Sequence, residues 1–150
     1  GQTLVDRSSS TGSKKSFYYA PQSQAGGPNV LLHFTVRAEA CGNIEPHQRW
    51  ATGLLVDNAD ISGAIGLGNR GTDGSGHGWS MGWGVAWNAK ADQLAIAAPP
   101  GATNWAIGSS GELTPYLPDA KQLDPAPKLG ETDSTGVRVG PDSLYLMQLC

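Results

Sequence analysis

Histidine, arginine and tryptophan are concentrated in two stretches of the chain, residues 45–53 and 68–88. The polar residues in these stretches that could take part in a reaction are His47, Arg49, Asn69, Arg70 and His77. An imidazole titrates near neutral pH and can move protons, and a guanidinium matches a carboxylate through two parallel hydrogen bonds. Side chains of these types could remove a proton beside a carboxylate and stabilise the negative charge that develops.

Four of the five tryptophans lie in the same two stretches, where glycine is also frequent. The flat apolar face of a tryptophan suits the C–H face of a sugar ring, and glycine lets a bulky ligand approach the backbone closely. We therefore predict a carbohydrate site with His47, Arg49, Arg70 and His77 as its catalytic residues. The predicted substrate contacts are Trp50, Asp57, Asn69, Trp79, Trp83 and Trp87.

Simpler roles for these residues remain open. A tryptophan beside glycine can fill the core, and Arg49 or Arg70 can bond turn carbonyls. Glu45 and Asp57 are also compatible with turn and surface positions. The two histidines His47 and His77 stand beside Gly or Pro rather than in apolar runs, which favours a site over a buried core position.

Composition argues against several other classes of protein. The net charge is −3 and no basic stripe is present, so we expect no nucleic-acid partner. No apolar run approaches the roughly 18 residues of a membrane span. The sequence has no Cys/His spacing typical of a metal site and no nucleophile elbow, and we predict no cofactor.

Short alternating runs separated by Gly, Pro, Asn or Asp predict an all-β fold. The clearest run is Val30–Arg37, in which apolar and polar residues alternate as in a strand with one buried face. The further predicted strands are Phe17–Ala20, Gly53–Ile61, Ala64–Leu67, Gly84–Ala91, Leu94–Ala97 and Trp105–Gly108.

Three runs resemble one another, beginning at Leu32, Val56 and Ala86 and lying about 24 and 30 residues apart. Such a loose period favours a coiled β-solenoid over the alternative, a β-sandwich. In this alignment Asn58 and Asn88 point inward and form a stacked amide ladder. The same alignment places His33, Asp57 and Trp87 in one outward column.

The composition changes near Leu117, after which Pro, Asp, Lys, Gly and Thr dominate. We predict solenoid coils over residues 1–117 and an extended tail over residues 118–150 that ends in a short helix. Asp142 or Ser143 is its predicted N-cap, and Leu144, Tyr145 and Met147 supply an apolar stripe for packing on the β core. The sequence leaves open whether Cys41 and Cys150 form a disulfide.

Several motifs together resemble a family of secreted fungal and bacterial pectate-lyase-like β-helix proteins. The resemblance covers about Ser10 to Leu149 and rests on Glu45–Gly53, Asn69–Gly71 with Gly76–Trp79, Pro99–Gly101 with Asn104–Gly108, and Ser143–Leu149. It implies a right-handed parallel β-helix, export from the cell, and action on or binding to polysaccharide.

The chain departs from that family in two respects. Its members are longer, so the chain resembles their C-terminal part, and the open end of the core needs a cover. We expect a preceding N-terminal region, a second chain or self-association at that end. Pectate lyases also hold calcium with an Asp cluster, whereas Asp57 and Asp60 are the only neighbouring acids on a predicted strand here. Calcium is therefore not supported.

The leading functional hypothesis is an extracellular polysaccharide lyase that cleaves a uronic-acid-containing glycan by β-elimination. A glycoside hydrolase is the second, and it requires two carboxyls such as Glu45 and Asp57 on either side of the bond. A non-catalytic polysaccharide-binding or structural β-helix protein is the third.

Overall fold

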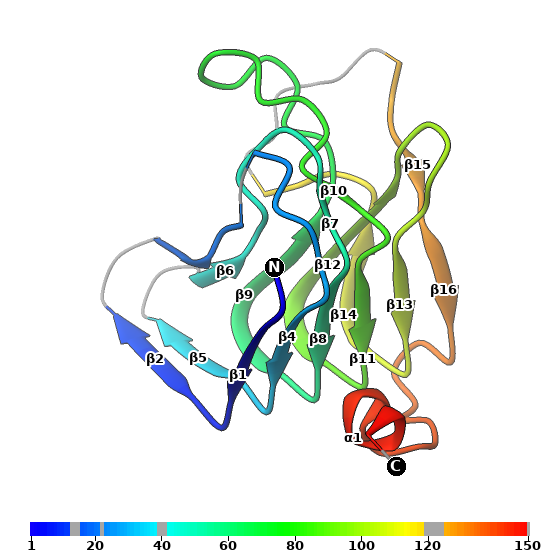
Figure 1. Cartoon of the computed structure of the whole chain (residues 1–150). Coiled ribbons are helices and arrows are strands. Elements are labelled where there is room, and N and C mark those ends of the chain that lie inside the picture. The colour runs from blue at the N-terminus through cyan, green and yellow to red at the C-terminus, as the bar shows by residue number, and fades with distance from the viewer. Residues whose placement is uncertain (13–15, 22, 39–41, 119–124, 150) are drawn as a thin grey trace.

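The chain forms a parallel β-solenoid of about four turns with one short helix near its C-terminus (Figure 1). The computed structural model describes residues 1–12, 16–21, 23–38, 42–118 and 125–149. The predicted all-β solenoid is thus confirmed and the sandwich alternative is wrong. Cys41 and Cys150 lie outside the described residues, so the structure does not describe whether they form a disulfide.

One face of the solenoid is a six-stranded parallel sheet, here called sheet A. Its strands in spatial order are β1 (Thr3–Asp6), β4 (Asn29–Leu32), β8 (Leu54–Asp57), β11 (Val85–Trp87), β13 (Trp105–Ile107) and β16 (Glu131–Asp133). β16 comes from the segment that the sequence assigns to the tail, so sheet A continues beyond the predicted coil boundary at residue 117.

The second face, sheet B, forms the other side of the coils. Its strands are β2 (Ser9–Gly12), β5 (Thr35–Ala38), β9 (Asp60–Leu67), β12 (Lys90–Ala98) and β14 (Ser110–Thr114), and β3 (Ser16–Tyr19) and β6 (Gly42–Ile44) extend it beside β9. Two short elements complete the fold. β7 (Ala51–Thr52) pairs with β10 (Met81–Gly82), and β15 (Lys128–Leu129) pairs antiparallel with β12.

The core lies between the two sheets. Leu31, Val56 and Ala86 are all fully buried and occupy equivalent positions of successive coils. The alignment of Val56 with Ala86 is therefore confirmed, but that of Leu32 is wrong by one residue, because Leu31 is the partner of Val56. Since side chains alternate across a strand, this shift puts Leu32 on the outer face.

The long alternating runs of the sequence are broken at one recurring corner between sheets A and B. His33, Asn58 and Asn88 follow the last residues of β4, β8 and β11, and each has a positive φ, of 50°, 55° and 48°. The corners stack, with the backbone N–H of Asn58 donating to the Trp87 carbonyl. Asparagine tolerates this left-handed conformation better than most residues.

Because they occupy this corner, Asn58 and Asn88 do not form the predicted inward amide ladder. Asn88 instead donates to the Val139 carbonyl (2.9 Å) and accepts from the Val139 N–H (2.8 Å), and Asn58 donates to the Asp142 carbonyl (2.7 Å). Both amides thus attach the C-terminal segment to the solenoid. The outward column contains Leu32, Asp57 and Trp87 rather than His33.

A different asparagine occupies the interior. Asn104 is fully buried, donates to the carbonyls of Ala97 and Met81 and accepts from the N–H of Gly84. Buried polar groups need such partners, and this single side chain connects several coils at once.

The C-terminal helix α1 (Leu144–Gln148) begins at Ser143, whose hydroxyl accepts from the Leu146 N–H. The predicted N-cap is confirmed. The helix buries none of its residues, and Met147 is 61% exposed. Leu144 and Tyr145 are partly buried, so the predicted apolar stripe is covered only in part, and polar contacts with the ends of the sheet A strands also hold the helix.

Candidate functional site

A hairpin projects from the solenoid between β9 and β10, at the top of Figure 1. Asn69 and Trp79 form an antiparallel bridge, and the Arg70 N–H donates to the Gly78 carbonyl (2.9 Å). The Asp73 carbonyl accepts from the His77 N–H (3.0 Å), which closes the tip. This excursion makes its coil longer than its neighbours, and it carries four of the predicted site residues.

The two predicted stretches meet along the second arm of this hairpin, from His77 to Trp79. The N–H groups of Arg49 and Trp50 donate to the carbonyls of His77 (3.1 Å) and Trp79 (2.8 Å). The imidazole rings of His47 and His77 meet edge to face, with their centroids 4.7 Å apart. The four predicted catalytic residues therefore lie together, although they come from separate coils.

Arg70 contacts the backbone of His47 and is only 13% exposed. Its Nε lies 3.6 Å from Glu45 Oε1 and 3.9 Å from Asp73 Oδ2, and its Nη1 donates to the His47 carbonyl (3.2 Å). Glu45 is itself 3% exposed and accepts from the Asn43 amide. The charge of Arg70 is thus compensated by two carboxylates, and its contacts fix the backbone that carries His47.

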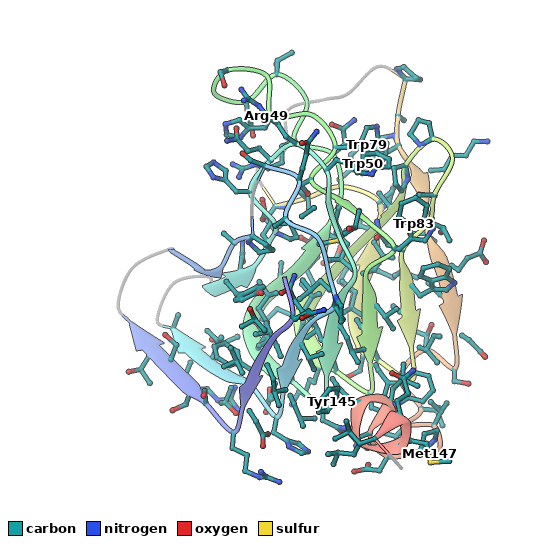
Figure 2. The ribbon with its side chains drawn as sticks, viewed as in Figure 1. Arg49, Trp50, Trp79, Trp83, Tyr145 and Met147 are labelled. Carbon is teal, nitrogen blue, oxygen red and sulfur yellow. The ribbon has the colours of Figure 1, made fainter. Side chains whose placement is uncertain are left out.

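Arg49 has a different environment. Its side chain is exposed and donates to the Ser75 hydroxyl (3.1 Å) in the hairpin tip. Figure 2 shows Arg49 at the same end of the molecule as Trp79 and Trp50. Of the two predicted arginines, Arg49 is therefore the better placed to meet an anionic ligand.

The two histidines differ in their surroundings. Burial lowers the pKa of His47 below its usual value of 6.5, and electrostatic interactions with Arg70 and His77 lower it further. His47 is therefore neutral at neutral pH, as a proton acceptor must be. The Nδ1 atom of His77 is buried and makes no hydrogen bond to any described residue.

An open groove of about 840 Å³ lies beside the hairpin. Trp79, Asn69, Gly71 and Thr72 of the hairpin line it, together with two proline-rich segments that contain Pro99, Pro100, Gly101, Pro125, Ala126, Pro127 and the cation Lys128. Both Asn69 and Trp79 were predicted to contact substrate. The prolines and Lys128 were not among the predicted site residues, although the Pro99–Gly101 motif is conspicuous in the sequence.

The aromatic residues continue from the groove onto sheet A. The rings of Trp50 and Trp83 lie edge to face with centroids 6.4 Å apart, and Trp83 is 49% exposed. A methyl group on Gly82 would lie 3.3 Å from the Trp50 ring and 3.5 Å from Ala102. The absence of a side chain at Gly82 thus lets the Trp50 ring pack closely over the strand.

Asp57 and Trp87 are the last residues of β8 and β11 and lie beside the C-terminal segment that carries α1, away from this site. Figure 1 shows α1 beside the ends of these strands, on the side opposite the hairpin. The Asp57 carboxylate is fully buried and accepts from the Ser143 hydroxyl (2.7 Å) and the Tyr145 N–H (2.8 Å). The Trp87 indole donates to the Pro141 carbonyl (3.0 Å). Both residues anchor the C-terminal segment, so the structure does not join them with the other predicted substrate contacts.

The separation of Asp57 from Glu45 also bears on hydrolysis. Glu45 lies with Arg70 near the hairpin, whereas Asp57 lies under α1. These two carboxyls cannot flank one glycosidic bond, because that arrangement needs a separation of roughly 5 to 9.5 Å. Within the part of the chain that the structure describes, no cluster of three or more metal-ligating side chains is found.

Comparison with known proteins gives no relative. No protein-family model matches the chain, and neither the curated proteins nor the solved structures contain a match to it. No helix within the described ranges has the length and apolar character needed to cross a bilayer.

Proposed function

We propose that this chain is an extracellular carbohydrate-active protein that cleaves a uronic-acid-containing glycan by β-elimination. The observation that carries the proposal is the meeting of His47, His77 and Arg49 at the hairpin whose other residues, Trp79 among them, line the groove. The similarity of the motifs to those of pectate-lyase-like proteins supports it. The low charged fraction of 15% is common among exported proteins and agrees with an extracellular location.

In this mechanism Trp79 stacks on a sugar ring and Lys128 attracts the acidic chain into the groove. Arg49 pairs with the carboxylate of the reacting uronic residue and stabilises the enolate that develops there. His47, whose ring is held edge to face by the His77 ring, accepts the proton from the carbon next to this carboxylate. The C–O bond to the leaving sugar then breaks, and the leaving oxygen takes up a proton from water. The products are an unsaturated uronide and a shortened chain.

Arg70 acts in this scheme as a positioning residue. Its guanidinium holds the His47 carbonyl, and Glu45 and Asp73 neutralise its charge. Replacement by Lys should keep part of this charge pairing but lose the bidentate reach of the guanidinium. Such a variant should retain some activity, whereas replacement by Ala leaves the buried Glu45 carboxylate without that partner.

The test is incubation of the purified chain with polyuronides and with neutral glycans, followed by mass spectrometry of the products. Unsaturated products from a polyuronide support the lyase, and their mass identifies the substrate. Saturated products would show hydrolysis instead, and would overturn β-elimination.

One observation favours a second function, polysaccharide binding without cleavage. The charge of Arg70 is compensated and the Glu45 carboxylate is buried, so only part of the cluster can contact a ligand. The same groove would then serve as a wall-binding surface. Binding of a polyuronide without any product would support this function over the lyase.

We also propose that the N-terminal end of the solenoid is covered in the functional protein. β1 and β2 are the edge strands of their sheets there, and Leu4 is 46% exposed. Such parallel edges present unpaired backbone groups that can pair with another strand. A preceding region, a second chain or a second copy would cover them. A chain that stays folded and monomeric across a wide concentration range, as measured by sedimentation, would contradict this proposal.

A further inference from the structure

The outer face of sheet A has an apolar strip beside the exposed Trp83. Ala86 and Ala106 belong to the buried core, so their strand neighbours Val85 and Trp105 point outward. Val85 and Trp105 are register partners on β11 and β13. The outer face therefore presents an indole and an aliphatic side chain next to each other.

The backbone holds Trp83 close to this pair. The Trp83 N–H donates to the Thr103 carbonyl (2.9 Å), and the Trp105 N–H donates to the Gly84 carbonyl (2.9 Å). Trp83 and Trp105 thus stand on adjacent coils, and Trp83 lies two residues before Val85, the register partner of Trp105.

The strip is continuous with the groove. Gly101 lines the groove, and the next residue, Ala102, packs near Gly82 and the Trp50 ring. Trp50 in turn meets Trp83 edge to face. Trp79, Trp50, Trp83 and Trp105 thus follow one another from the groove to the outer face of sheet A.

The charges along this path change sign. The groove contains Lys128, and Arg49 lies at the same end of the molecule. On sheet A the register partner of Trp105 is Glu131, an exposed carboxylate, and Asp133 follows two residues later. A uronic carboxylate is attracted at the first end and repelled at the second.

We infer that the outer face of sheet A at Trp83 and Trp105 is a second carbohydrate-stacking site, selective for neutral sugar rings. This inference rests on the proposed function and deepens it. The ligand is then a mixed glycan, whose uronic residue lies at the groove and whose neutral residues stack on sheet A. Trp105 and Glu131 are the specificity-determining residues of this second site.

The experiment is calorimetric titration of the full chain with two probe sets, oligogalacturonides and a panel of neutral xylo-, gluco- and manno-oligosaccharides. Trp105→Ala and Trp83→Ala should each weaken binding of a neutral oligosaccharide about tenfold, the loss expected for one aromatic contact. Trp105→Phe keeps an aromatic ring and should retain most of the binding affinity for the neutral oligosaccharide. Val137→Ala, at a side chain that is 66% exposed on the C-terminal segment, is the matched control and should change nothing.

Glu131→Gln provides an independent readout that does not disturb the core. It should strengthen binding of long oligogalacturonides, because it removes the repulsion at the second site, and should leave neutral oligosaccharides unaffected. Glu112→Gln, at an exposed position on sheet B, is its control and should have no effect.

The outcomes separate this inference from the proposed function. Failure of every neutral oligosaccharide to bind, or equal binding by wild type, Trp83→Ala and Trp105→Ala, would overturn the second site. If the second site fails in this way but oligogalacturonides still bind, and Trp79→Ala weakens their binding, the groove proposal stands. Absence of binding to oligogalacturonides and to every other polyuronide of the glycan panel would overturn the groove proposal itself.

Discussion

The imidazole rings of His47 and His77 meet edge to face with centroids 4.7 Å apart, although the two residues belong to successive coils. Their contact depends on the backbone hydrogen bond from Arg49 to His77, which ties the hairpin to the preceding coil. Coil stacking therefore assembles this site, as it does the core.

The pKa of His47, which burial and then Arg70 and His77 lower below 6.5, predicts how stability depends on pH. Between the lowered pKa and 6.5 the unfolded chain binds more protons at this residue than the folded chain does. The free energy of unfolding should therefore rise with pH across this window and fall on acidification. Urea unfolding of wild type and His47→Gln at pH 7 and pH 5 measures the effect.

His47→Gln should lose part of this pH dependence. His33→Gln, at the Asp6 contact near the opposite end of the coils, should retain the His47 contribution. Equal pH dependence in wild type and His47→Gln would contradict the lowered pKa.

Two glycines of the hairpin tip offer a matched pair of substitutions. Gly74 and Gly76 both have positive φ, of 54° and 84°, so alanine strains either backbone similarly. A methyl group on Gly74 would lie 2.4 Å from His77 Nε2, whereas one on Gly76 meets nothing within 4 Å. Gly74→Ala should therefore displace the His77 ring and lower turnover at least tenfold more than Gly76→Ala.

Steady-state rates on the substrate that the glycan panel identifies check this prediction. Histidine ring signals in NMR spectra should shift in Gly74→Ala alone. Equal loss of rate in the two variants would mean that the position of the His77 ring is unimportant.

The buried carboxylate of Asp57 should contribute strongly to stability. Asp57→Ala removes the acceptor for the Ser143 hydroxyl and the Tyr145 N–H, and a buried donor left without a partner costs about 1–3 kcal/mol. We expect a loss of roughly 3 kcal/mol in the free energy of unfolding and fast amide exchange in α1.

Asp60 is the control for this change. Its pair with Arg37 is half exposed (2.6 Å), and such pairs contribute about 0–1 kcal/mol. Asp60→Ala should be nearly neutral and should leave amide exchange in α1 unchanged. If Asp57→Ala is equally mild, α1 is held by other contacts.

Asn104 should be among the most sensitive positions of the core. Asn104→Leu removes the donor for the carbonyls of Ala97 and Met81 and the acceptor for the Gly84 N–H, in a fully buried site. A loss of about 3 kcal/mol or more is expected in denaturant unfolding. A loss below about 1 kcal/mol would show that the coils do not depend on this side chain.

The sequence predicts the solenoid well because stacked coils repeat the same local pattern. Val56 and Ala86 are recognisable as equivalents, since both precede an Asp or Trp and then an Asn. The error at Leu32 arose because two leucines precede His33, and the pattern alone does not say which of them faces inward. A one-residue shift of this kind exchanges the two faces of a strand.

The site could be predicted only in part. Its histidines and arginines are conspicuous because chemistry limits the residue types that can do this work. Two features depend on which edge of the coils each turn occupies. One is the pairing of Arg70 with Glu45 and Asp73, and the other is the position of Asp57 beside α1, away from the hairpin. The interior position of Asn104 is not predictable from the sequence, because burial of a polar side chain is decided by its long-range partners.

The measurement that tests the central claim most directly is product formation from the identified polyuronide by wild type, His47→Ala, His77→Ala and His33→Ala. We predict an unsaturated product from wild type and from His33→Ala at equal rates. His47→Ala should be slower by at least about a hundredfold, the usual contribution of a positioned base, and His77→Ala should also be slower. Undiminished rates in His47→Ala and His77→Ala would contradict the claim that these two histidines carry the reaction.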